Sequence, residues 1–236
     1  QVYRNRLKIT VDIVQSDIFK TGSTGPEEYI LDPEYPNLFS VELTLIDSDS
    51  QRERDFIKSY FGMRKIHSEN GIIYLNNKPY YQNLSLTRDI GQDLLTAPSD
   101  ADYRQDITLA KQMGFNGCRK HQKLEDPRFL YWADKLGYLV WEECSSTPLF
   151  TTQSQIAILD SWKETYLRDR NHPCIVAWVP LNESWGVPNI HADESQQHWA
   201  QSLYHFLHSL ATLFVSSNDG WDQTITDICA IHIIDL

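Results

Sequence analysis

The chain has 236 residues, 41% of them hydrophobic and 12% aromatic, and its 32 acidic against 21 basic residues give a formal net charge of −11. This apolar content supports a buried core and argues against intrinsic disorder. The acidic balance argues against a protein that tracks nucleic-acid phosphates, and no apolar run approaches the roughly 20 residues that span a bilayer. We therefore expect a soluble, folded protein without nucleic-acid or membrane partners.

The N-terminal sequence QVYRNRLKIT lacks the apolar core of a signal peptide, which favours a cytoplasmic location. A secreted or periplasmic protein whose signal peptide is missing from the sequence stays open as an alternative. The four cysteines, Cys118, Cys144, Cys174 and Cys229, form no CxxC pair and have no histidine at zinc-site spacing. We expect mostly buried, reduced thiols, no metal site and no cofactor.

The first 66 residues have the period-two hydrophobic pattern of half-buried strands. Alternation predicts strands over residues 7–14 and 38–46, and a third strand is expected over 55–66. A turn-rich loop occupies residues 21–26, and residues 47–50 read as a hairpin tip. These strands are too few for a complete β-sandwich, so we predict part of one.

From Gly71 onward, predicted strands alternate with predicted helices. Ser99 and Asp102 form a capping-box pattern that opens the first helix, and further helices are expected over 127–136, 156–167 and 199–210. Strands are expected over 80–86, 115–119, 138–141, 175–179, 214–217 and 227–231. This α/β alternation indicates about six units of a (β/α)₈ TIM barrel, two short of a full one. A doubly wound sheet competes, although neither a GxGxxG nor a GxxxxGK[ST] motif occurs.

Active-site residues of a barrel follow the carboxyl ends of its strands. The residues at those positions are carboxylates, amides, imidazoles, indoles and basic groups: Arg119, Lys120, His121, Glu142, Glu143, Asn182, Glu183, Ser184, Trp185, Asn218, Asp219, Trp221 and His232. Carboxylates and amides bind hydroxyl groups, and indoles pack on sugar rings, so this rim suits a polyhydroxylated ligand. Acid–base cleavage of a glycosidic bond needs two carboxyl groups, one of them kept protonated.

The stretch NHPCIVAWVPLNES at residues 171–184 resembles the acid/base signature of glycoside hydrolase family 2, which includes β-galactosidases, β-glucuronidases and β-mannosidases. Further matches follow in order at residues 60–66, 75–80, 114–121 and 134–143. The resemblance implies an immunoglobulin-like β-sandwich domain, partly present at 1–66, and a partial TIM-barrel catalytic domain at 67–236.

The resemblance also implies a retaining, β-galactosidase-like hydrolase that cleaves terminal β-glycosides. Glu183 would be the general acid/base, and Asn182 would hydrogen-bond the sugar 2-hydroxyl. Four further residues are expected to shape or support the sugar site: Arg119 and His121 as a rim pair, Glu143 as a supporting acid, and His232 near a position where some relatives carry a reactive-centre tyrosine. Trp185 is either a sugar platform or a packing aromatic.

The chain also departs from the family pattern. The nucleophilic glutamate of the family follows the seventh barrel strand, so we expect it beyond Leu236, and Leu86-Thr87 replaces a usual Asp-Gln pair. A catalytically inactive sugar-binding fragment is therefore the alternative function. A homo-oligomer in which two chains close the barrel also stays open. The sequence does not distinguish among galactosides, glucuronides and mannosides.

Overall fold

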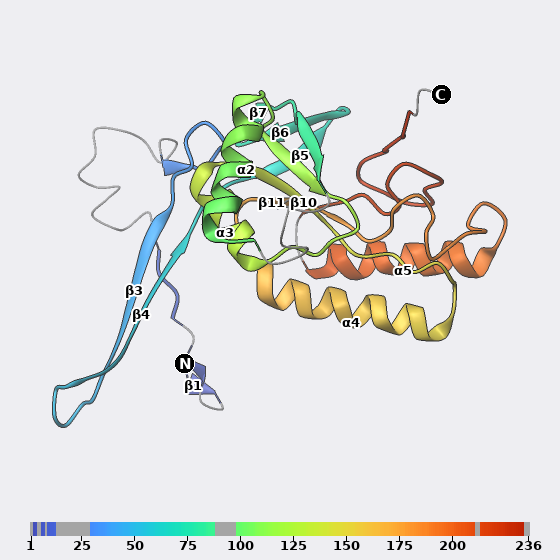
Figure 1. Ribbon diagram of the computed structural model, residues 1–236. Helices are drawn as coiled ribbons and strands as arrows, with labels where there is room; N and C mark the ends of the chain where they lie inside the picture. The colour runs from blue at the N-terminus through green and yellow to red at the C-terminus, as the bar shows by residue number, and fades with distance from the viewer. Residues whose placement is uncertain are drawn as a thin grey trace.

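The computed structural model of the chain describes residues 2–3, 6–7, 9–12, 29–87, 98–210 and 213–233. Figure 1 shows a long two-stranded ribbon that extends away from a body of alternating strands and helices. Among the described helices, none is long and apolar enough to cross a membrane.

The N-terminal part matches the expected strands only in places. Strands β1 (Val2–Tyr3) and β2 (Arg6–Leu7) form a short antiparallel pair. Residues 9–12 are not in a strand, so the strand predicted over 7–14 is wrong there, and its last two residues lie outside the described ranges. The expected loop at 21–26 also lies outside them.

The ribbon is the hairpin of β3 (Phe39–Ile46) and β4 (Glu53–Phe61), which confirms the strand expected over 38–46. Its tip is held by Asp47, whose carboxylate accepts hydrogen bonds from the Ser50 amide at 2.8 Å and from Arg54. The strand expected over 55–66 instead ends at Phe61. At Gly62 a Cβ would lie 2.9 Å from side-chain atoms of Leu31 and Pro173, because the chain here packs closely on the body.

One face of the ribbon carries Leu43, Leu45 and Ile57, all exposed. Within the described residues, no second sheet covers this face. An immunoglobulin-like sandwich over residues 1–66 therefore stays a prediction.

Residues 66–79 form a three-stranded antiparallel sheet that the sequence patterns did not predict. It consists of β5 (Ile66–Glu69), β6 (Ile72–Leu75) and β7 (Lys78–Pro79). Both of its turns have two residues with positive φ, Asn70-Gly71 and Asn76-Asn77, as tight hairpin turns require. The Asn-Gly pair was the available sequence signal.

The body is built on five parallel strands: β8 (Leu84–Thr87), β9 (Gly117–Lys120), β10 (Leu139–Glu143), β11 (Ile175–Val179) and β12 (Phe214–Val215). Between them run α2 (Asp100–Gln112), α3 (Pro127–Leu136), α4 (Thr152–Asp169) and α5 (Glu194–Leu210). Each strand lies beside its predecessor, in the order β12-β11-β10-β9-β8. A doubly wound sheet reverses its strand order at a switch point, so this order has the sequential topology of a barrel instead.

The described part of the sheet has five strands, whereas about six units were expected. The strand predicted over 227–231 does not form. Instead the Asp227 carboxylate accepts hydrogen bonds from the Tyr204 hydroxyl and the Val215 amide, both at about 2.7–2.8 Å. These contacts fix the chain next to α5 and β12, and the residues that follow reach the carboxyl end of the sheet.

Two apolar cores lie on opposite sides of the parallel sheet. The larger core joins the sheet to the helices and includes Ile107, Leu130, Trp162 and Trp178. The smaller core, on the inner side, includes Trp141, Val176, Val179 and Phe214. Three of the four cysteines are buried free thiols as expected, whereas Cys229 is exposed.

Candidate active site at the carboxyl ends of the strands

A cavity of about 570 Å³ lies at the carboxyl ends of the parallel strands. Its walls come from β8, β9, β10, the segments after β11 and β12, and the C-terminal segment: Leu84, Ser85, Leu86, Arg119, His121, Trp141, Glu183, Asp219, Ile231, His232 and Ile233. The site therefore lies at the end of the sheet where barrel enzymes place their chemistry.

Arg119 at the end of β9 is the centre of the polar network. Its Nη1 lies 2.6 Å from Glu143 Oε2 and 2.6 Å from Asp219 Oδ2, and it donates to Asn182 Oδ1 at 3.0 Å. The three acceptors come from three different strand ends. One guanidinium thus fixes the relative positions of the ends of β9, β10 and β11 and the segment after β12.

Glu143 is fully buried at the end of β10. Burial raises the pKa of this carboxyl to about 7, while Arg119 and the Gln122 amide, which donates at 2.6 Å, act in the opposite direction. A carboxyl with a pKa this close to neutrality changes its protonation within the ordinary working pH range. Asp219 contacts the same guanidinium, so Glu143 shares the positive charge of Arg119 with a second carboxylate.

Asn182 follows β11 and is also fully buried. Its Oδ1 accepts from Arg119, and its Nδ2 lies 3.2 Å from His121 Nε2. A backbone bridge to Asp219 holds the same residue from the other side. Contacts on both ends of the amide fix its orientation.

Glu183 lies at a sharp bend just after β11. Its φ of 50° and the 59° of Ser184 are in the left-handed region, which costs free energy for residues with a Cβ. Two contacts hold the bend: the Glu183 amide donates to Asp219 O at 2.9 Å, and the Ser184 amide donates to Asn218 Oδ1 at 2.8 Å. The strained turn brings the Glu183 carboxyl to the cavity wall.

His232 approaches this carboxyl from the C-terminal segment, with its Nδ1 2.6 Å from Glu183 Oε1. Its other ring nitrogen, Nε2, lies 3.4 Å from Arg119 Nη2. The imidazole therefore connects Glu183 to the Arg119 network.

The structure separates the predicted site residues into two layers. Arg119, His121, Glu183 and His232 line the cavity, whereas Asn182 and Glu143 lie behind it and contact Arg119. Trp185 is half exposed and is not among the residues found to line the cavity. Sequence reasoning placed Asp219 on the rim without a role, and it did not identify Trp141, whose position in the third strand was the available signal.

Two further rim candidates point away from the cavity because side chains alternate along a strand. Lys120 lies 2.7 Å from Glu125 and packs over the Phe129 ring on the helix side of the sheet. Glu142 accepts a hydrogen bond from the Glu125 amide there, and burial raises its pKa well above the ordinary value.

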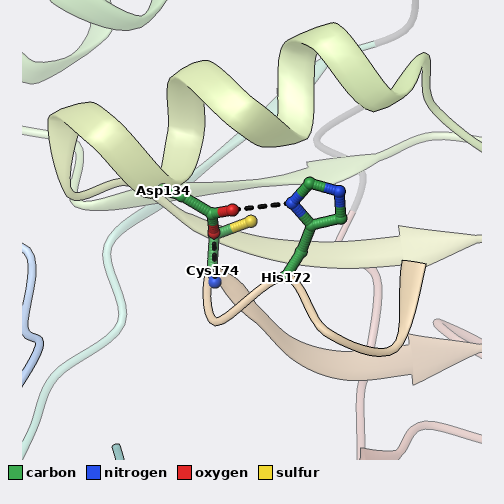
Figure 2. A group of neighbouring side chains, drawn as sticks. All are labelled: Asp134, His172 and Cys174. Atoms are coloured by element: carbon green, nitrogen blue, oxygen red, sulfur yellow. Dashed lines mark hydrogen bonds and ion pairs between the residues drawn. The ribbon is translucent and has the colours of Figure 1, made fainter. Parts of the chain in front are cut away.

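A second cluster, Asp134, His172 and Cys174, groups three side chains of metal-ligand type (Figure 2). The Asp134 carboxylate already accepts from His172 Nδ1 at 2.6 Å and from the Cys174 amide at 2.8 Å. Burial raises the pKa of the Cys174 thiol, which opposes the thiolate that a metal needs. These contacts describe a structural junction, since both oxygens of the Asp134 carboxylate already accept hydrogen bonds from its two neighbours.

Comparison with known proteins places the chain in a family. The profile of the glycosyl hydrolases family 2 TIM barrel domain matches residues 66–234. A Vibrio cholerae β-galactosidase is 29% identical over 67% of the chain, and a Streptococcus agalactiae β-glucuronidase is 29% identical over 55% of it. The chain spans 16% and 25% of the lengths of these two relatives.

Solved structures agree on the fold. A Bacteroides uniformis β-glucuronidase superposes with a TM-score of 0.69 at 25% identity, covering 79% of this chain and 24% of its own. A Parabacteroides merdae β-glucuronidase gives the same TM-score and the same coverage of both chains at 22% identity. The chain therefore belongs to glycosyl hydrolase family 2, with residues 66–234 matching the TIM barrel domain of that family.

Proposed function

We propose that the chain carries the acid/base centre of a retaining β-glycosidase that acts on terminal β-glycosides, in the manner of β-galactosidases. One observation carries the proposal: the Asn182-Glu183 pair follows β11 on a strained turn, and Glu183 reaches a cavity large enough for a sugar. The same chain is similar to proteins named β-galactosidase and β-glucuronidase.

Four residues in or beside the cavity have roles in this reaction. Glu183 protonates the departing glycosidic oxygen and then deprotonates the attacking water. We assign to Asn182, which Arg119 and His121 hold behind the cavity wall, the hydrogen bond to the sugar 2-hydroxyl, an interaction that strengthens as positive charge develops at the anomeric carbon. Trp141 and Leu86 supply apolar wall for the ring faces.

The test is Glu183→Gln in the full-length gene product, assayed on a natural disaccharide and on an aryl glycoside with an activated leaving group. We expect turnover of the disaccharide to fall by about 10²–10⁴-fold, the usual contribution of general acid–base catalysis, and turnover of the aryl glycoside to fall less. Glu194→Gln, on the exposed start of α5, is the matched control. Unchanged disaccharide turnover by Glu183→Gln would refute the assignment.

A sugar-binding function without turnover is the second candidate. Turnover needs a second carboxylate besides Glu183. The other two carboxylates of the network, Glu143 and Asp219, are both engaged with Arg119 at 2.6 Å, and this favours binding without turnover. Calorimetry with galactosides, glucuronides and mannosides, run beside a turnover assay of the 236-residue chain, separates the two functions. Turnover that disappears in Glu183→Ala would exclude the binding-only function.

A further inference from the structure

We propose that His232 is the positioning residue of Glu183: it holds one carboxylate oxygen and leaves the other for the glycosidic oxygen. This inference rests on the proposed function, because it assigns a role relative to the acid/base. It also gives a specific role to His232, which the sequence placed only near the sugar site.

The contact between the two side chains is short and partly protected from water. His232 Nδ1 lies 2.6 Å from Glu183 Oε1, and the side chains are 21% and 27% exposed. Both residues line the cavity. A charge-assisted hydrogen bond of this length restricts the rotation of the carboxylate.

The surroundings of the ring determine which nitrogen carries the proton. Nε2 lies 3.4 Å from Arg119 Nη2, and a guanidinium has donors only, so Nε2 of a neutral ring must accept. The proton of the neutral ring is then on Nδ1 and is donated to Glu183 Oε1. Asp219 Oδ2 lies 3.7 Å from Nε2 on the same side of the ring.

The absence of a side chain at Gly220 leaves the space that the His232 ring occupies. The His232 amide donates to Gly220 O at 3.4 Å, and a Cβ at Gly220 would lie 2.3 Å from His232 Nδ1. Gly220 also has a φ of 94°, which favours glycine. Any side chain at position 220 would therefore displace the imidazole from Glu183.

The arrangement assigns different tasks to the two carboxylate oxygens. Oε1 accepts from His232, so Oε2 is the oxygen that the described part of the chain leaves for a ligand. General acid catalysis requires its proton to lie on the line toward the leaving oxygen, and small misplacements are costly. His232 thus acts on the reaction through Glu183.

The first test needs no turnover. Nitrogen-15 NMR of the histidine rings in the 236-residue chain reports the tautomer of each ring directly. We expect His232 in the Nδ1–H form, with its Nδ1 signal shifted in both Glu183→Gln and Gly220→Ala. His198→Ala, on the exposed face of α5, is the control and should leave that signal in place. An Nε2–H tautomer, or a His232 signal insensitive to Glu183→Gln, would overturn the proposal.

The second test is kinetic and uses the full-length gene product. We expect His232→Ala to lower kcat about 10–100-fold on a disaccharide and less than about threefold on an activated aryl glycoside, which needs little acid assistance. Gly220→Ala should show the same contrast, and His232→Gln should recover part of the loss because its amide can donate to Glu183. Equal losses on both substrates, no loss, or a change in KM alone would contradict a positioning role.

The two tests also separate this inference from the proposed function. If Glu183→Gln leaves disaccharide turnover unchanged, the acid/base assignment fails, whatever the NMR signals show. If Glu183→Gln abolishes that turnover but His232→Ala does not lower it, only the positioning role fails.

Discussion

Single residues at the rim show how one buried cation controls several carboxylates. Arg119 lies 2.6 Å from both Glu143 and Asp219, so one positive charge serves two negative ones. The desolvation cost of ionising the fully buried Glu143 is larger than the stabilisation that it receives from a guanidinium shared with Asp219. The pKa of Glu143 rises to about 7 for that reason. Folding therefore shifts the balance toward protonated Glu143, relative to the unfolded chain.

This imbalance predicts a pH-dependent effect of Glu143→Gln. A carboxyl whose pKa is higher in the folded state than in the unfolded chain binds more protons when folded, so its contribution to stability falls as pH rises from about 4.5 to about 7. At about 1.4 kcal/mol per pKa unit, the fall is roughly 3 kcal/mol. We expect Glu143→Gln to lack this fall. The difference in free energy of unfolding, variant minus wild type, should therefore be larger at pH 8 than at pH 5, by up to that amount.

Urea unfolding of both proteins at pH 5 and pH 8 measures this difference. The exposed Asp160→Asn on α4 is the control and should show no such pH-dependent difference. A difference between Glu143→Gln and wild type that is the same at both pH values would contradict the prediction.

At the scale of elements, local sequence signals were sufficient where one segment determines its own structure. The Ser99–Asp102 capping box forms at the start of α2, with Ser99 Oγ accepting from the Asp102 amide at 3.3 Å and Asp102 Oδ2 accepting from the Ser99 amide at 2.7 Å. Helix α3 has Asp126 as its N-cap and Gly137 as its C-cap. Both were expected, because Asp126 precedes Pro127 and Gly137 follows the apolar stripe. The strands of the parallel sheet are recognisable because they are continuous apolar runs.

The capping box gives a prediction for α2. Ser99→Ala removes the oxygen that satisfies an otherwise unpaired amide, and such losses cost about 1 kcal/mol. We expect the free energy of unfolding to fall by that amount. The matched control is Ser161→Ala, because Ser161 Oγ donates back to the Ala157 carbonyl within α4 and is not a cap. Equal losses for the two variants in urea unfolding would contradict the capping role.

Local sequence signals failed for segments whose conformation depends on residues far away in the chain. Asp227–Ile231 has the composition of a strand, but Asp227 is held by Tyr204 and the Val215 amide, which no local pattern reveals. Strand-end positions identified the rim residues, because parallel strands end at one edge. Which of them line the cavity and which lie behind it follows from side-chain direction and register, so Glu143 and Asn182 could not be separated from His121 and Glu183 beforehand.

At the scale of the whole molecule, Asp134 joins three parts of the chain. The Tyr60 hydroxyl at the end of β4 donates to Asp134 Oδ2 at 2.7 Å, and His172 and the Cys174 amide bind the same carboxylate from the turn before β11 (Figure 2). Asp134 itself belongs to α3. The ribbon, the helix layer and the parallel sheet thus meet at one buried carboxylate, although Tyr60 and Asp134 lie 74 residues apart in the sequence.

Burial, together with the charge and hydrogen bond of Asp134, raises the pKa of Tyr60 above its ordinary value, so the phenol remains a donor in alkaline solution. A double-mutant cycle of Tyr60→Phe and Asp134→Asn then measures how strongly the ribbon is attached. We expect Asp134→Asn alone to lower the free energy of unfolding by about 3 kcal/mol, because His172 and the Cys174 amide also lose a charged acceptor. The coupling to Tyr60→Phe should be about 1–2 kcal/mol, as for groups in one hydrogen-bond network.

Tyr35→Phe provides the matched cycle, since Tyr35 is 70% exposed and its coupling to Asp134→Asn should be near zero. Urea unfolding at pH 7 and pH 9 should give the same Tyr60–Asp134 coupling, because the raised pKa of Tyr60 keeps its hydroxyl a donor at both values. A coupling near zero would mean that the ribbon is held by apolar contacts around Gly62 and not by the carboxylate. In that case Tyr60→Phe would have the same effect on stability in wild type and in Asp134→Asn, while a larger residue at position 62 would disturb the contacts with Leu31 and Pro173.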